Sequence, residues 1–301
     1  MKLKEYLLYG FFIILIILIC INSDFVSEGF SEGLSIWYNS IVPLLLPFLL
    51  LSGLLMSLID FESGGKAGAL IILFVCGLLC GYPVGAIIIN RLYSKNIISK
   101  KFAYAIMPLC NNVSPMFLLG YIYNDYVKGY MSVCEILSVI YIPQIIYFVL
   151  FQVISRPAFR NRNNGSGNSI FSSALPEIAA SEENTADIIE NSISTITVIG
   201  VYIAVFSVIS NIMFYFSNDF MPLKIAACYM EITKGISSIN QIIPDITKKT
   251  AFILSVTSFG GVSSLLQSMH ILKQTKLSFF AYTFGKLICC FASYIITTCM
   301  I

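Results

Sequence analysis

The sequence predicts an all-α polytopic membrane protein made of inverted structural repeats, each with a broken or re-entrant helical hairpin. Hydrophobic residues form 57% of the 301 residues and charged residues only 11%, whereas a soluble domain carries roughly 25% charge. The apolar runs allow about eight membrane segments of ~20 residues. Two runs far apart in the chain are also broken in the same way by glycine and small polar residues.

These two interrupted runs are Leu78–Arg91 and Thr257–His270. Such a pair, at matching places in two halves, is the best sequence-level indication of a transporter's binding site. The pattern therefore predicts a carrier. The alignment pairs Val84 with Val262, Lys95 with Lys273, and Phe102–Tyr104 with Phe280–Tyr282.

Residues 1–33 are predicted to form a signal-anchor helix and an outside loop. Lys2 and Lys4 precede the apolar stretch Tyr6–Ile21, and no small-x-small cleavage site follows. By the positive-inside rule the N-terminus is cytoplasmic. The loop Ser23–Gly33 has acidic residues but no basic ones, as expected outside.

Residues 34–154 form the first predicted repeat. It begins with a helix at about 34–59, which Pro43 and Pro47 should kink. Residues 66–90 lie between two basic ends, so we expect a re-entrant hairpin with its tip at Gly81-Tyr82-Pro83. A helix at about 102–123, interrupted at 110–115, and a helix at 130–154 complete the repeat.

A polar linker is predicted at 155–189 and a second repeat at 190–301. In that repeat, Ser192–Phe216 should cross outward, and Phe220–Ile243 should lie at the interface because it carries several charges. Phe252–Met269 is predicted to be the second hairpin, with both ends outside. The last helix, about Leu277–Ile301, should then run inward.

The hairpin tips are the predicted ligand site. Unpaired N–H groups at half-helix starts favour an anion, Pro83 stops the helix, and glycines let the backbone approach a ligand. Alternatively, the glycines only permit close helix packing. The glycines concerned are Gly81, Gly85, Gly260 and Gly261.

Polar residues in mid-membrane extend this site. Asn111, Asn112 and Ser114 lie beside Pro115, where they line a cavity or merely cap a kinked helix. Lys286 lies deep in the last helix, and an ionisable group there marks a pathway or a counter-ion. The alternative is a structural ion pair of Lys286 with Glu135 or Glu190.

Other classes have little support. No nucleophile–base pair, phosphate loop or nucleic-acid signature occurs, so we expect neither an enzyme nor a nucleic-acid partner, and no cofactor. The nine cysteines fit no disulfide framework. Cys76, Cys80 and Cys110 leave a soft-metal path open, but packing is the simpler explanation, and no metal site is predicted.

The segments Cys80–Ala86, Leu92–Lys100 and Pro108–Phe117 resemble the sporulation integral membrane protein YlbJ (SpoVV) family. Ser258–Ser263, through to Gln267, resembles the second motif of that family. The family belongs to the nucleoside-recognition Gate group and is similar in architecture to concentrative nucleoside transporters.

This resemblance implies an inverted-repeat carrier in the outer forespore membrane that moves dipicolinate, a small aromatic dianion, from the mother cell. A nucleoside or metal-ion carrier and a non-transporting cortex-assembly protein remain alternatives. The predicted substrate-binding residues are Gly81, Tyr82, Pro83, Gly85, Asn111, Asn112, Ser114, Ser258, Gly260, Gly261, Gln267 and Lys286.

Overall fold

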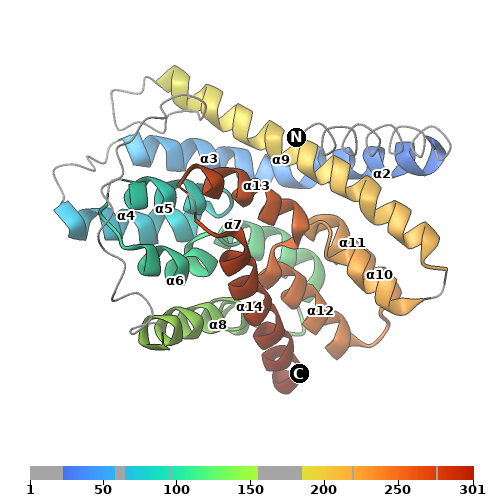
Figure 1. Ribbon diagram of the computed structural model, residues 1–301. Coiled ribbons are helices and arrows are strands. Elements are labelled where there is room, and N and C mark those ends of the chain that lie inside the picture. Colours follow the sequence, from blue (N-terminus) through green and yellow to red (C-terminus); the bar gives the residue numbers. More distant parts are fainter. Residues whose placement is uncertain (1–22, 58–64, 95, 155–184, 219, 276) are drawn as a thin grey trace, which may run out of the picture.

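The computed structural model describes residues 23–57, 65–94, 96–154, 185–218, 220–275 and 277–301, and these are helical apart from turns and one isolated bridge (Figure 1). The predicted first helix and most of the predicted linker lie outside these ranges. The elements are α2 (Ser23–Ile36), η1 (Trp37–Ile41), α3 (Val42–Ser57), α4 (Gly65–Cys80), α5 (Val84–Ser94), α6 (Lys100–Cys110), α7 (Pro115–Phe117), η2 (Leu118–Val127), α8 (Val133–Ile154), α9 (Thr185–Phe216), α10 (Met221–Cys228), α11 (Ile232–Ile242), α12 (Ile246–Phe259), α13 (Gly261–Gln274) and α14 (Phe279–Met300).

Six helical segments of the described chain are long and apolar enough to cross a membrane, so this is a polytopic α-helical membrane protein. Two of them, Lys100–Val127 and Ile246–Met269, are mostly buried in protein, and the other four are more exposed. The expected number of about eight is not confirmed. The arms of two hairpins, α4–α5 and α10–α11, are not among the six.

The predicted loop Ser23–Gly33 is wrong, because these residues form most of helix α2. Its glycines face α9: a Cβ added at Gly33 would lie 2.8 Å from the Cα of Ala204. The acidic residues that indicated a loop lie instead on the less buried side of this helix. Helix α9 likewise starts at Thr185, inside the predicted linker.

Proline explains the irregular turn between α2 and α3. Pro43 has no N–H, so it cannot donate to the carbonyl four residues earlier. The chain takes a wider π-helical turn here, in which the N–H of Val42 donates to the carbonyl of Trp37. The predicted kink region is therefore a π-turn just before Pro43.

The first predicted hairpin and the first interrupted helix are confirmed. Helices α4 and α5 pack against each other and are joined at Gly81–Pro83. Helix α6 ends at Cys110, and the chain is extended at Ser114 because Pro115 disfavours a helical residue before it.

The second predicted hairpin is placed wrongly. Helices α12 and α13 are separated only by Gly260 and are not packed side by side as hairpin arms are, so they form one interrupted segment. The hairpin of this half is α10–α11, in the region predicted to be interfacial. Glu231 and Lys234 there are only 4% and 8% exposed, so this region packs inside the protein.

The same order of elements occurs in both halves: a helix, a hairpin, an interrupted helix and a long helix. Helix α6 packs on α8 and α14, and α12 packs on α14 and α8. The second hairpin arms α5 and α11 both have 11 residues, and α8 and α14 both have 22. This order relates α5 to α11 and α8 to α14. The sequence alignment instead pairs α5 with α13, for example Val84 with Val262.

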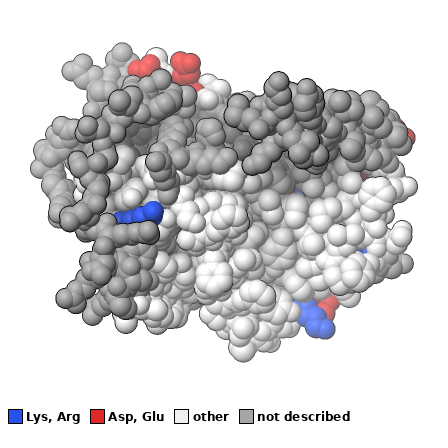
Figure 2. Space-filling model, in the orientation of Figure 1, with Lys and Arg blue, Asp and Glu red and all other residues white. Residues whose placement is uncertain are grey.

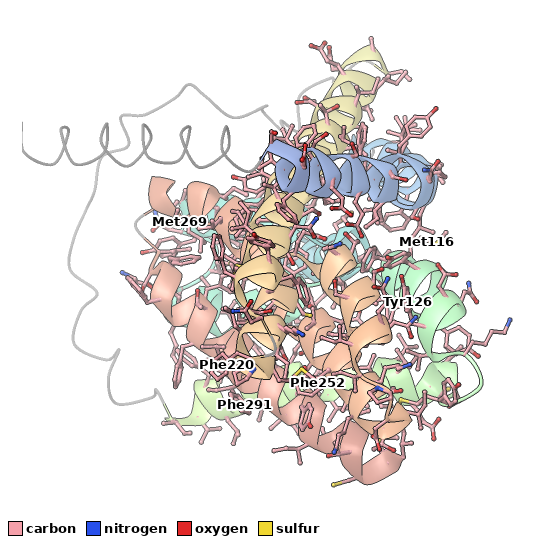
Figure 3. All side chains as sticks on the ribbon, turned by 90° about the vertical axis from the view of Figure 1, so that its right-hand side faces the viewer. Met116, Tyr126, Phe220, Phe252, Met269 and Phe291 are labelled. Carbon is pink, nitrogen blue, oxygen red and sulfur yellow. The ribbon has the colours of Figure 1, made fainter. Side chains whose placement is uncertain are left out.

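The outer surface is apolar. The face in Figure 2 carries few charged atoms on its described residues. Phe220 and Phe291, labelled in Figure 3, are 64% and 67% exposed, and α8 exposes a stripe of aliphatic side chains. Such a surface requires lipid around it.

Candidate functional site

The breaks in the helices meet in the centre of the protein. A Cβ added at Gly81 would lie 2.8 Å from the backbone N of Ser114, so the α4–α5 tip touches the α6–α7 break. One added at Gly260 would lie 2.0 Å from the hydroxyl of Tyr82. The α12–α13 junction therefore closes on the same tip.

The α10–α11 tip joins this assembly from the other hairpin. The N–H groups of Val262 and Ser263 donate to the carbonyls of Tyr229 and Met230, at 2.9 and 3.0 Å. These bonds tie the start of α13 to the α10–α11 connection. Both hairpin tips and both interrupted helices thus contribute to one site.

The predicted glycines are in close contact with other parts of the protein and do not face open space. A Cβ at Gly85 would lie 1.9 Å from the carbonyl oxygen of Cys110, which brings α5 against the end of α6. Gly81, Gly260 and Gly261 have φ values of +68°, +94° and +72°. Their positive φ makes the two helix breaks possible, one at Gly81 and one at Gly260-Gly261. Their place in this structure is explained by backbone geometry and close packing.

Asn111 ties three elements together. Its Oδ1 accepts from the N–H of Ala86 at 3.2 Å, and its Nδ2 donates to Ser268 and Tyr282 at 2.7 and 2.9 Å. The Tyr282 hydroxyl in turn donates to the carbonyl of Asn111. Of the two roles predicted for Asn111, these contacts support the structural one.

The starts of the half-helices already have internal partners. Asn111 accepts from α5, Ser114 caps α7, and Glu231 caps α11 by accepting from the N–H of Lys234 at 2.8 Å. Helix α13 donates to backbone carbonyls, as described above. Because buried N–H groups must be paired, the expected set of free N–H groups is not found at these positions.

Lys286 is the buried cation of the site. It is 0% exposed, its amine donates to Oδ1 of Asn112 at 2.8 Å, and it lies 5.3 Å from the ring centroid of Tyr82. In the described part of the chain it forms no ion pair. Glu135 instead accepts from the N–H of Ser132 at 2.6 Å, so the predicted alternative pair with Glu135 is wrong.

Unpaired polar atoms occur on Asn112, which contacts this lysine, and on helices α8 and α12. Nδ2 of Asn112 and Oγ of Ser258 are buried and have no hydrogen-bond partner. On α8, the hydroxyl of Tyr141 and the amide of Gln144 are also buried without a hydrogen-bond partner. Buried polar groups without partners are rare, so Asn112 and Ser258 are available to a ligand or to water.

Tyr82, which lies against Lys286, also lines a cavity. Of the predicted residues, Tyr82, Ser114 and Gln267 line it, whereas Lys286, Asn112 and Ser258 do not. The full lining is Ile41, Leu45, Cys80, Tyr82, Val113, Ser114, Phe117, Ile199, Ile203, Glu231, Ile232, Thr233, Ser263, Ser264 and Gln267.

Glu231 is the main site residue that was not predicted. It lies on the cavity wall and is buried. The signal was present: a carboxylate in a largely apolar segment. The sequence interpretation placed that segment at the membrane surface, where a charge needs no explanation. The hydroxyl of Thr233 was missed for the same reason, whereas Ser263 and Ser264 lie in the predicted second hairpin and were not among the predicted site residues.

Cys76, Cys80 and Cys110 are buried and are not in disulfide bonds. In the described ranges no group of three His, Cys, Asp or Glu could hold a metal ion.

Comparison with known proteins gives one informative similarity. No protein-family model and no solved structure matches. The chain is 20% identical over 330 residues to "Sporulation integral membrane protein YlbJ" of Bacillus subtilis strain 168, an alignment that spans 95% of this chain and 80% of that protein. This multi-pass α-helical membrane protein is therefore similar over nearly its whole length to a sporulation membrane protein.

Proposed function

We propose that this chain is a sporulation membrane carrier for a small anionic solute, and not an enzyme. One observation carries the proposal: Lys286 is fully buried, has no ion pair in the described chain, and lies where the helix breaks meet. An intramembrane lysine costs about 2.5–3.5 kcal/mol on insertion scales, so such residues usually serve function. The similarity to a sporulation membrane protein supports the cellular role.

The free groups around Lys286 favour an anion. The Lys286 amine and Nδ2 of Asn112 belong to side chains that contact each other. Both are donors, and the amide Nδ2 has no partner. Charge-assisted hydrogen bonds from such donors to a carboxylate are the strong ones. Tyr82 lines the cavity and lies against Lys286, so we propose that its ring moves aside or stacks on the arriving solute.

Dipicolinate is the solute we propose. Its two carboxylates match the donors at Lys286, and its flat ring matches the face of Tyr82. The corresponding location is the outer forespore membrane with a cytoplasmic N-terminus, and the corresponding architecture is a pair of inverted repeats, which the repeated order of elements supports.

The test is the dipicolinate content of spores from a deletion strain that still synthesises the compound. We expect a strong loss, restored by the wild-type chain. Normal content in the deletion strain would refute the proposal. Uptake of dipicolinate by the purified protein in liposomes then separates direct transport from an indirect effect.

A nucleoside carrier is the second candidate. The amides of Asn112 and Gln267 are at or beside the cavity, and amides recognise base edges by hydrogen bonds. Uptake of a nucleoside instead of dipicolinate by the same liposomes would favour it. An Asn112→Leu protein that inserts normally and still supports sporulation would instead favour a scaffold.

A further inference from the structure

Glu231 is a buried carboxylate that has no positively charged partner among the described residues. It is 4% exposed and accepts hydrogen bonds from the hydroxyl of Thr233 and the N–H of Lys234. Both donors are neutral. The amine of Lys234 pairs instead with Glu32 of α2. A buried charge is expensive unless it is paired, so this carboxylate requires a cation or a proton.

Of the residues that the structure describes, no cationic side chain lines the cavity beside Glu231. Tyr121 of η2 interacts electrostatically with Glu231, and Cys228 of α10 interacts with Lys234. Tyr82 also lines the cavity, and α9 contributes Ile199 and Ile203 to the lining. Helix α13 contributes Ser263, Ser264 and Gln267, and none of the lining residues comes from α12.

A proton suits this position better than a metal ion. The carboxyl is buried, and the hydroxyl of Thr233 and the N–H of Lys234 already occupy part of its hydrogen-bonding capacity. Within the described part of the chain, no group of three His, Cys, Asp or Glu could hold a metal ion. A proton needs no shell of oxygen ligands.

We propose that Glu231 carries a proton that moves together with the anionic solute. This inference rests on the proposed function. An ionised Glu231 on the cavity wall would repel a carboxylate solute, and binding of one proton to that carboxylate removes the repulsion. Proton binding and anion binding then strengthen each other by the same factor. The proton leaves Glu231 on the far side, as the solute is released.

The test uses the full chain in liposomes, with dipicolinate as the probe. One pH unit corresponds to 1.36 kcal/mol, so an inward proton gradient of that size can drive up to about tenfold accumulation per coupled proton. We expect the gradient to stimulate uptake by wild type and by the control Glu28→Gln, whose residue is exposed on α2. For Glu231→Gln, uptake with the proton gradient divided by uptake without it should be about 1.

Infrared difference spectroscopy gives a readout that does not need the solute. Wild type should show a protonated carboxyl band that Glu231→Gln lacks and Glu28→Gln keeps. Wild-type uptake that Glu231→Gln matches at every pH gradient would overturn the inference, as would uptake driven by a sodium gradient alone. Absence of uptake with the infrared band present would instead refute the proposed solute and leave Glu231 as a proton site.

Discussion

Adjacent asparagines in the α6–α7 break have different roles at the scale of single residues. Asn111 uses its whole amide on Ala86, Ser268 and Tyr282. Asn112 receives the Lys286 amine and keeps Nδ2 unpaired. The sequence predicted both as site residues but could not separate them, because their partners come from distant helices.

Replacing Asn111 by Ala should destabilise the protein. The change leaves the Ala86 N–H without its acceptor and removes the donor to Ser268, and a buried unsatisfied group costs about 1–3 kcal/mol. The thermal midpoint of the purified protein in detergent should fall. Asn124→Ala is the control, because Asn124 is exposed and only contacts its own helix. Equal midpoints for the two variants would contradict the structural role.

Replacing Lys286 by Met should abolish transport but keep the protein in the membrane. Methionine retains the apolar stem and removes the insertion cost of the charge. A charge-assisted contact is worth about 1.5–3 kcal/mol, so affinity should fall roughly ten- to a hundredfold. Spore dipicolinate content and membrane abundance are measured together, and Lys128→Met, an exposed lysine, is the control.

Lys286→Arg refines this result, since a planar guanidinium keeps the charge but changes the geometry. Partial transport is expected. Normal abundance together with normal dipicolinate loading in the Met variant would remove Lys286 from the site.

At the scale of elements, local signals predicted some segments well. The basic ends and Gly81-Tyr82-Pro83 predicted the α4–α5 hairpin, and Pro115 predicted the break after α6. Gly260-Gly261 gave the same kind of signal, but there the backbone breaks the helix without reversing it.

The α10–α11 hairpin was missed because charge was taken as a sign of exposure. Glu231 caps α11, and Lys234 pairs with Glu32, so both charges have structural partners inside the protein. The partner of Lys234 lies far away in the chain, and the capping role of Glu231 depends on where α11 starts. A residue pattern alone shows neither.

Gly235 should be essential for the α10–α11 hairpin. A Cβ there would lie 1.9 Å from the carbonyl oxygen of Cys228, a backbone atom that cannot rotate away. Gly235→Ala should force the arms apart, at a cost of about 1–3 kcal/mol for overpacking. Gly68→Ala on α4 is the matched control, since nothing lies within 4 Å of its Cβ. A thermal midpoint for Gly235→Ala as high as that of the control would refute this packing.

At the scale of the whole molecule, the interrupted segment α12–α13 changes the predicted topology. A hairpin there would leave α14 running in the same direction as α8, as the sequence predicted. A single crossing reverses α14. Starting from the beginning of α8, the chain crosses with α8, α9, α12–α13 and α14. If α10–α11 enters and leaves on one side, the start of α8 and the end of α14 lie on the same side of the membrane.

Two native cysteines can test this topology. Cys134, at the start of α8, and Cys299, at the end of α14, are exposed, while the other described cysteines are buried. With Cys20 replaced by Ala, the Cys134→Ala protein keeps exposed Cys299, and the Cys299→Ala protein keeps exposed Cys134. We expect a membrane-impermeant maleimide to label both variants from the same side of sealed vesicles. Labelling from opposite sides would show that α10–α11 crosses the membrane or that α12–α13 turns back. Either result would remove the antiparallel relation of α8 and α14 on which an inverted repeat depends.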